Sequence, residues 1–259
     1  MPVRLGYSDN AYDQLPTVIA HRGASGEAPE NTLPAFELAA AQGARWLEVD
    51  VGLSADGQCV IFHDERLERC TDGKGWLLQH TLDELQHLDA GLWFGKQFRN
   101  TRIPTLAELL DFAEANDIGL NLEIKPVIGR EAETVWAMQQ ELIRHPLHQP
   151  ILLSSFNTTA LKCARTHMPH ITRALLTEAI PKDWQQRLHD LECSGLHFCA
   201  DLIEPAQVAL IRDAGYRALA YTVNNPDLAL RLYDNGVNAV FTDFPSRLLK
   251  SAPLSERPH

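Results

Sequence analysis

Short runs of apolar residues recur along the chain, and stretches with the periodicity of amphipathic helices separate them. The runs have the length of buried β-strands, and their alternation with helical segments is typical of a parallel α/β protein. Strands are predicted at about residues 17–21, 46–51, 58–63, 119–125, 150–155, 172–176, 194–198, 216–223 and 237–241. The alternation favours a TIM-type (β/α)8 barrel, which needs one strand fewer than these nine.

The dipeptide Asp56-Gly57 accounts for the surplus strand, because it suits the positive-φ positions of a two-residue type I′ hairpin turn. The second and third predicted strands would then form a hairpin in which residue 50 lies opposite residue 63. We therefore expect Asp50 and His63 to be cross-strand neighbours, with the segment after Asp50 folded back over the barrel mouth.

The stretch that follows this hairpin lacks sustained helical or strand periodicity. Residues 64–104 are rich in Gly, Asp and aromatic residues, and a helix is expected to begin near Pro104. Long irregular segments in compact domains are often functional, so we expect an inserted lid or small subdomain here. A chain of 259 residues with 45% apolar residues suits one barrel, so a single domain over 1–259 is predicted, with the insertion at about 64–104.

Composition narrows the partners and the compartment. The net charge of −11 disfavours nucleic acid and anionic lipid surfaces, which are bound through clustered Lys and Arg, although a small anion could be captured locally. The five cysteines form no CxxC, so neither a disulfide framework nor a thiolate zinc site is indicated. The amino terminus lacks an apolar signal-peptide core and no apolar run approaches bilayer-spanning length. A soluble cytoplasmic protein without integral membrane association is expected, and its oligomeric state is left open.

Charged residues interrupt the carboxyl ends of the predicted strands. Because a strand alternates its faces, Glu48 and Asp50 point to one side, and so do Glu123 and Lys125. Isolated carboxylates are costly to bury, and TIM barrels place catalytic groups at this rim. Glu48, Asp50 and Glu123 are therefore predicted to converge as oxygen ligands for a divalent cation such as Mg²⁺ or Ca²⁺. The alternative is a structural ion network in which they pair with Arg22 and Lys125.

Two of the eleven histidines, His21 and His63, stand at predicted strand ends beside these charges. Two imidazoles near a metal suit a reaction that needs one acid and one base close to neutral pH. The other nine histidines are interpreted as surface or structural residues. Arg22 and Lys125 would supply cationic donors for a phosphate oxygen that approaches the metal.

The loop after the first predicted strand, RGASGEAPENT, also suits a ligand site. Gly23 and Gly26 would allow the loop backbone to approach a ligand closely. Asn31 or Thr32 is expected to cap the following helix.

Eight blocks of residues, taken together in this order, resemble the signature of the glycerophosphodiester phosphodiesterase family. The likeness covers residues 19 to 245, and the order and spacing of the blocks are specific where any single block is not. The blocks are His21-Arg22-Gly23, Pro29-Glu30-Asn31-Thr32, Glu48-Val49-Asp50-Val51, His63-Asp64, Glu123-Ile124-Lys125, Ser154-Ser155-Phe156, Tyr221-Thr222-Val223-Asn224 and Phe241-Thr242-Asp243-Phe244-Pro245.

The resemblance implies roles at the matching positions. Glu48, Asp50 and Glu123 look like the family's metal ligands for one divalent ion, with Mn²⁺ as a third candidate beside Mg²⁺ and Ca²⁺. His21 and His63 look like its acid and base pair, and Arg22 and Lys125 like its phosphate-contacting cations. Phe156 and Tyr221 resemble the aromatic residues that flank the substrate; ordinary core packing is the alternative for both.

The implied activity is metal-dependent hydrolysis of a small glycerophosphodiester to sn-glycerol 3-phosphate and an alcohol. Tyr221 stands where many members of the family have tryptophan, which leaves the preferred headgroup open. Two other functions compete with this one. The first is a lysophospholipase D-like phosphodiesterase acting on lipid, and the second is a catalytically silent barrel that binds a phosphate ligand.

Overall fold

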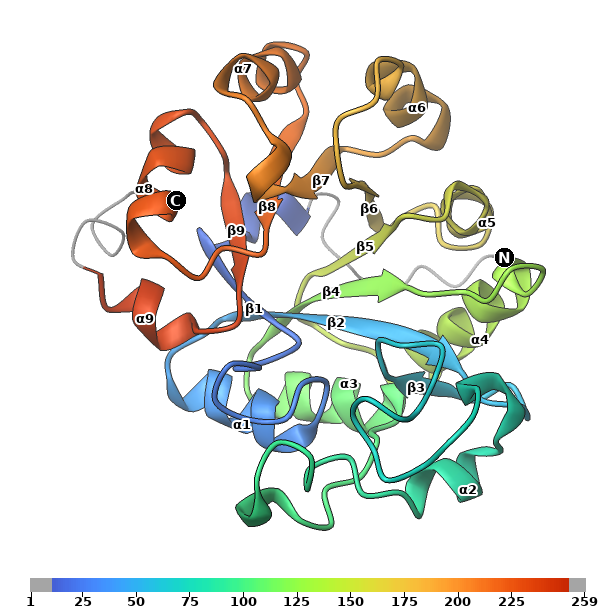
Figure 1. Cartoon of the computed structure of the whole chain (residues 1–259). Helices are drawn as coiled ribbons and strands as arrows, with labels where there is room; N and C mark the ends of the chain where they lie inside the picture. The colour runs from blue at the N-terminus through green and yellow to red at the C-terminus, as the bar shows by residue number, and fades with distance from the viewer. Residues whose placement is uncertain (1–10, 252–259) are drawn as a thin grey trace.

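A closed barrel of parallel β-strands forms the centre of the protein (Figure 1). The structure is a computed structural model that describes residues 11–251, so expectations for residues 1–10 and 252–259 lie outside it. The described strands are β1 (Val18–His21), β2 (Trp46–Leu53), β3 (Cys59–Ile61), β4 (Gly119–Ile124), β5 (Ile151–Ser155), β6 (Thr172–Thr177), β7 (Gly195–Cys199), β8 (Arg217–Tyr221) and β9 (Ala239–Thr242). Pairing of β1 with both β2 and β9 closes the barrel, which confirms the predicted TIM-type fold.

Helices follow the barrel strands and surround them (Figure 1). They are α1 (Leu33–Ala41), α3 (Leu106–Ala115), α4 (Glu131–Arg144), α5 (Thr158–His167), α6 (Trp184–Leu191), α7 (Pro205–Asp213), α8 (Pro226–Asp234) and α9 (Pro245–Leu249). Local sequence starts several of them: Thr105 and Glu108 form a capping box at α3, and the Asn157 side chain accepts from Ala160 N at α5. Proline at the first position begins α7, α8 and α9.

The predicted hairpin exists, but its predicted register is wrong by one residue. β3 pairs antiparallel with β2, and Phe62 N donates to Asp50 O over 2.9 Å, so Asp50 lies opposite Phe62 rather than His63. The turn holds three residues instead of two, because Ser54 N bonds Gln58 O over 3.0 Å and Gly57 takes φ +77°. His63 follows the end of β3 and still lies close enough for its charge to act on Asp50.

The segment from 64 to 104 connects β3 to α3 and lies at the edge of the barrel next to β3 (Figure 1). It contains α2 (Leu82–Gln86) and two short 3-10 helices, η2 (Leu77–Gln79) and η3 (Lys96–Phe98). Its apolar side chains pack with those of β3 in a cluster separate from the barrel core, formed by Val60, Phe62, Leu67, Cys70, Leu77, Leu85, Ala90 and Ile103. This packing holds the segment against the hairpin.

Apolar side chains fill the amino-terminal end of the barrel. Tyr12, from the 3-10 helix η1 (Ala11–Gln14), packs there in one cluster with Ile19, Trp46, Leu152, Ala174, Leu219, Ala239 and Phe241. Gly195 makes room for it, since a Cβ at this position would lie 2.0 Å from the Tyr12 hydroxyl oxygen. The barrel is thus filled at this end.

Candidate active site

A cavity of about 250 Å³ opens at the carboxyl end of the barrel. Each predicted site residue except Asp50 and Lys125 lines it directly, and those two contact residues that do. Its full lining is His21, Arg22, Glu48, His63, Asn121, Glu123, Ser154, Phe156, Leu176, His197, Tyr221, Thr222 and Phe241. The barrel therefore brings the whole predicted set of side chains together.

Three carboxylates form an acidic cluster at this cavity. Glu48 and Asp50 come from β2 and Glu123 from β4, and each offers an oxygen within 4.8 Å of the others. Asp50 pairs with Glu123 across the parallel strands, which places both side chains on the inner face. Glu48 and Asp50 are only 4% and 1% exposed, so their charges are largely withdrawn from water.

The pKa values of these carboxyl groups shift in opposite directions. Burial, together with repulsion from Asp50 and Glu123, raises the pKa of Glu48 well above its ordinary value. Burial and the charge of Asp50 likewise raise the pKa of Glu123 to about 7. For Asp50, burial is outweighed by the charges of Arg22 and Lys125, which hold its pKa below the usual range. The positive charges of the neighbouring side chains therefore do not fully compensate the negative charge of the cluster.

The two predicted cations lie against this cluster. Arg22 donates from Nη1 to Glu30 over 2.7 Å, and its Nε lies 3.2 Å from Asp50 Oδ2. Lys125 Nζ lies 3.3 Å from Glu123 Oε1 and 3.7 Å from Asp50 Oδ1. Both cations pair with carboxylates, as the ion-network alternative requires, yet Arg22 also lines the cavity, where it can meet an anion.

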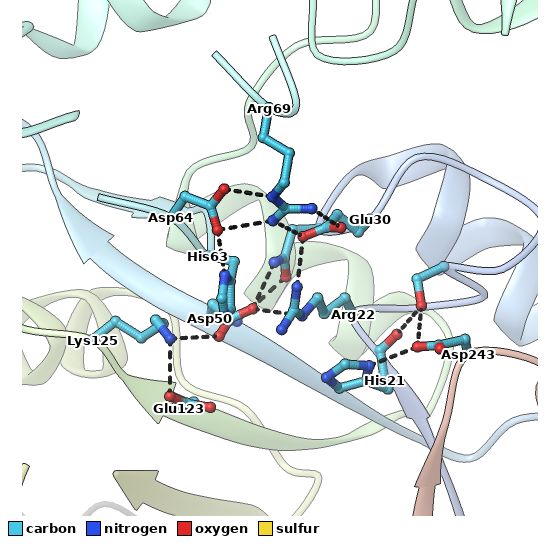
Figure 2. Close-up of polar contacts among 12 residues, drawn as sticks. His21, Arg22, Glu30, Asp50, His63, Asp64, Arg69, Glu123, Lys125 and Asp243 are labelled. Carbon is cyan, nitrogen blue, oxygen red and sulfur yellow. Dashed lines mark hydrogen bonds and ion pairs between the residues drawn. The ribbon is translucent and has the colours of Figure 1, made fainter. Parts of the chain in front are cut away.

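Each of the two imidazoles is fixed by a carboxylate on its Nδ1 atom (Figure 2). His21 Nδ1 lies 2.7 Å from Asp243 Oδ1, and His63 Nδ1 lies 2.5 Å from Asp64 Oδ1. Both rings line the cavity, and His21 Nε2 lies 3.8 Å from Glu48 Oε2. A carboxylate on one ring nitrogen fixes the orientation of the ring and leaves Nε2 for proton transfer.

The surroundings of these two imidazole–carboxylate pairs differ in charge. Asp243 accepts hydrogen bonds from the neutral groups Ser25 Oγ and Asn224 Nδ2, and the pKa of Asp243 falls to about 2 because these bonds and His21 outweigh burial. Asp64 is instead bound by the guanidinium of Arg69, from Nε over 2.5 Å and from Nη2 over 2.9 Å. Burial and the charges of Arg22 and Lys125 hold the pKa of His63 below its ordinary value.

Arg69 also connects the 64–104 segment to the barrel. Its Nη1 and Nη2 atoms donate to the two oxygens of Glu30 over 2.7 and 2.8 Å, and Glu30 in turn accepts from Arg22 (Figure 2). The bidentate geometry is the strong form of this pairing. One chain of contacts therefore runs from the inserted segment to the acidic cluster.

Sequence reasoning gave no role at the site to several of these neighbours, among them Asp243, Asp64, Arg69, Glu30 and Asn31. Asn31 was one of two residues expected to cap α1, but its side chain donates to Asp50 Oδ2 over 2.8 Å instead. Asp243, Glu30 and Asn31 do lie inside blocks of the signature, which was the available signal, whereas nothing marked Arg69.

The cap predicted for α1 is also corrected, whereas the approach of the loop glycines to a ligand stays a prediction. Thr32 occupies the N-cap position of α1, but its hydroxyl donates to Pro29 O over 2.6 Å and does not cap the helix. The two loop glycines pack against the protein itself. An added Cβ would lie 2.7 Å from Ala35 C at Gly23 and 2.4 Å from the Phe244 ring at Gly26.

The aromatic residues stand on the side of the cavity formed by the later strands. Phe156 and Tyr221 meet edge to face with ring centroids 6.1 Å apart, and Phe156 remains 46% exposed. The Tyr221 hydroxyl donates to Thr177 O over 2.8 Å, which orients its ring. The cavity thus has a charged wall from β1, β2 and β4 and a more apolar wall opposite.

The acidic cluster meets the requirements of a divalent cation. Within residues 11–251, Asp50 Oδ1 is buried and has no hydrogen-bond partner, and only the Lys125 amine approaches it at 3.7 Å. Burial and mutual repulsion raise the pKa values of Glu48 and Glu123 in spite of the nearby Arg22 and Lys125, so added positive charge would stabilise their ionised forms. Oxygen atoms from three carboxylates are the ligands that hard cations such as Mg²⁺ and Ca²⁺ prefer.

Taken together, a TIM barrel with a carboxylate cluster, two oriented imidazoles and two cations at its mouth defines the class of barrel hydrolases that act on phosphate esters. A sequence profile of the glycerophosphoryl diester phosphodiesterase family matches residues 21–247. The chain belongs to this family, and the predicted enzyme class, a phosphoric diester hydrolase of the glycerophosphodiester phosphodiesterase type, is confirmed.

Individual relatives agree with this assignment. A glycerophosphodiester phosphodiesterase of Caldanaerobacter subterraneus subsp. tengcongensis is 35% identical over 237 residues, covering 90% of this chain and 96% of the relative. A solved Oleispira antarctica phosphodiesterase, in complex with the product sn-glycerol-3-phosphate, is 48% identical with a TM-score of 0.90, covering 92% of this chain and 97% of that one. A solved Silicibacter pomeroyi structure, of a protein whose assignment as a glycerophosphoryl diester phosphodiesterase is itself inferred, is 27% identical with a TM-score of 0.83. The match covers 91% of this chain and 92% of that one.

None of the helices within residues 11–251 is both long enough and apolar enough to cross a bilayer.

Proposed function

We propose that this protein hydrolyses glycerophosphodiesters to sn-glycerol 3-phosphate and an alcohol such as choline, ethanolamine or glycerol. The observation that carries the proposal is the pair of carboxylate-bound imidazoles, His21 and His63, on one cavity with the three-carboxylate cluster. The Oleispira antarctica relative in complex with sn-glycerol-3-phosphate supports the same product for this chain.

Glu48, Asp50 and Glu123 would hold one divalent ion, Mg²⁺ or Ca²⁺, with Mn²⁺ as a third candidate. When bound, such an ion supplies positive charge that stabilises the charge developing on the phosphate oxygens. Arg22 and Lys125 add fixed positive charge on the same side of the cavity, where they bind and orient the phosphodiester.

His21 and His63 divide the proton transfers between them. One imidazole accepts the proton of the attacking hydroxyl at its Nε2, and the other donates a proton to the oxygen of the departing alcohol. Asp243 and Asp64 hold the two rings in position throughout. The attacking hydroxyl belongs either to water or to the glycerol C2 of the substrate, and the second route forms a cyclic phosphate that water then opens.

Phe156 and Tyr221 flank the substrate on the apolar side of the cavity. Their edge-to-face contact forms a surface for the carbon atoms of the substrate, away from the charged wall. The exposed ring of Phe156 lies where the alcohol group would leave.

The activity is tested by release of sn-glycerol 3-phosphate from glycerophosphocholine, glycerophosphoethanolamine and glycerophosphoglycerol, with Mg²⁺, Ca²⁺ or Mn²⁺ added. His21→Ala and His63→Ala are each expected to lower kcat by about 100- to 10,000-fold, the usual contribution of a general acid or base. His189→Ala is the matched control, because that imidazole is 80% exposed and lies outside the cavity. Full activity in both active-site variants, or no release from any substrate with any of the ions, would overturn the proposal.

The metal site is tested separately by calorimetric titration of the purified protein with each ion. Glu123→Gln keeps the shape of the side chain but removes its charge, so it is expected to weaken binding. Glu133→Gln is the control, since that carboxylate lies on the outer helix α4 and pairs with Arg130. Equal binding of every ion by the wild type and Glu123→Gln would exclude this cluster as the metal site.

A further inference from the structure

Three polar side chains lie between the apolar end of the barrel and the charged mouth. We call Asn121 of β4, Ser154 of β5 and His197 of β7 the polar floor, because all three line the cavity and are deeply buried. Two positions before them on the same strands, Leu152 packs in the apolar cluster and Gly195 faces Tyr12. All three side chains are essentially inaccessible to solvent, with exposures of 1%, 0% and 0%.

The hydrogen bonds of the polar floor are incomplete. Asn121 Nδ2 donates to Ser154 Oγ over 2.9 Å, and Asn121 Oδ1 has no partner in the described part of the chain. Reversing the amide would only exchange the unpaired atom, because Ser154 Oγ remains its one neighbour. His197 Nε2 lies 3.0 Å from the Tyr12 hydroxyl, while His197 Nδ1 is buried and unpaired among residues 11–251.

Two unpaired polar atoms on one cavity call for a ligand. A buried donor or acceptor without a partner destabilises the folded protein, and such groups in native proteins usually bind water or a ligand. The unpaired atoms belong to residues on β4 and β7, two strands that both contribute to the cavity lining. Neither Asn121 nor His197 has a part in the proton transfers or the metal site proposed above.

The polar floor is neutral, and this decides which ligand group it suits. Burial lowers the pKa of His197 to about 3, so the imidazole is uncharged at neutral pH. In the tautomer with the ring proton on Nδ1, the Tyr12 hydroxyl donates to Nε2 and Nδ1 is a donor. The Asn121 carbonyl oxygen is an acceptor. A hydroxyl group, which both donates and accepts, satisfies the two atoms, whereas a carboxylate or an ammonium group would lie there without an opposite charge.

We propose that the polar floor binds a hydroxyl group of the glyceryl part of the substrate and so selects for glycerol-containing phosphodiesters. This rests on the proposed function, which places the phosphate at the mouth beside Arg22. The glyceryl carbons then run between the phosphate and the floor, alongside the apolar side chains of Leu176 and Phe241. The departing alcohol lies outside, so the floor selects the part of the substrate that is retained in sn-glycerol 3-phosphate.

The test compares three substrates that differ only in hydroxyl groups. They are glycerophosphocholine and its two analogues in which the C2 or the C3 hydroxyl of the glyceryl group is replaced by hydrogen. The wild type is expected to prefer glycerophosphocholine over the C3 analogue by about 10- to 100-fold in kcat/KM, the effect of leaving a buried polar group unpaired. The C2 analogue also lacks the hydroxyl that can attack the phosphorus, so it reports on the nucleophile as well as on the floor. The decisive variant is Asn121→Leu, with Ser154→Ala as a second variant that is smaller than the native residue and so causes no overpacking.

The proposal predicts a selective loss in these variants. The kcat/KM for glycerophosphocholine should fall by about 10-fold or more, while that for the discriminated analogue changes little, so the preference disappears. Thr177→Val is the control: its hydroxyl is also buried and unpaired in the described chain, but it does not line the cavity, so the preference should persist. Circular dichroism and thermal unfolding establish that each variant is folded.

Two outcomes would overturn the proposal: a wild type that treats glycerophosphocholine and the C3 analogue alike, or variants that lose activity equally on these two substrates. The second outcome would mean that the floor holds a structural water only. Failure here is distinct from failure of the proposed function. If only the floor is misassigned, the wild type still releases sn-glycerol 3-phosphate, whereas a wrong function gives no release at all.

Discussion

His197 is the most deeply buried titratable group of the cavity, and its uncharged state links stability to pH. Burial lowers its pKa from the ordinary 6.5 to about 3, because no charged neighbour compensates for the lost hydration of the imidazolium. Between these two values the unfolded chain binds a proton that the folded protein does not. The contribution of His197 is therefore fully present above pH 6.5 and is lost as the pH falls towards 3.

The size of the effect follows from this difference in proton binding. Each pH unit inside the window changes the free energy of unfolding by at most ~1.4 kcal/mol per proton. Lowering the pH from 7 to 5 should cost about 2 kcal/mol through His197 alone, and a folded-state pKa higher by one unit would hardly change this figure. His197→Gln removes the titration but keeps an acceptor for the Tyr12 hydroxyl.

The assay is urea denaturation of the wild type and His197→Gln at pH 7 and at pH 5, without added metal. The wild type should lose about 2 kcal/mol more than the variant between the two pH values, whatever the variant's own stability at pH 7. His189→Gln is the control, because that side chain is 80% exposed and lies outside the cavity. Equal losses in the wild type and His197→Gln would refute the reasoning and would mean that His197 can be protonated in the folded protein.

Further predictions concern contacts around the cavity. Asp243→Asn should lower kcat by about 10- to 100-fold with little change in KM, because His21 loses its charged partner; steady-state kinetics that show a change in KM alone would contradict this role. Arg69→Met should speed limited proteolysis within residues 64–104 by removing the contacts to Glu30 and Asp64, and an unchanged cleavage rate would show that apolar packing alone holds the segment. Gly195→Ala should destabilise the protein by about 1–3 kcal/mol in urea denaturation, since its Cβ would overlap the Tyr12 hydroxyl, and an unchanged midpoint would show that Tyr12 moves freely.

The sequence determined the strands of the barrel and the inward direction of their charged residues. The nine predicted strands match the nine observed within residues 11–251, because each buried strand is a short apolar run bounded by turns. Glu48, Asp50 and Glu123 share a face because side chains alternate along a strand. Their convergence in one cavity followed from the rule that parallel barrels gather functional groups at one rim.

Only the tertiary structure decided the partners of these residues. His21 contacts Asp243 across 222 positions of sequence, and His197 contacts Tyr12 across 185. These contacts exist because the barrel closes and side chains fill its amino-terminal end. The hairpin register depended on the length of the turn. Ser54 pairs with Gln58, so the turn holds three residues, one more than the two-residue motif predicts. Periodicity reports the local conformation of the backbone. Side-chain partners depend on packing among distant segments, so the strands could be predicted from the sequence and the hydrogen bonds that orient the site could not.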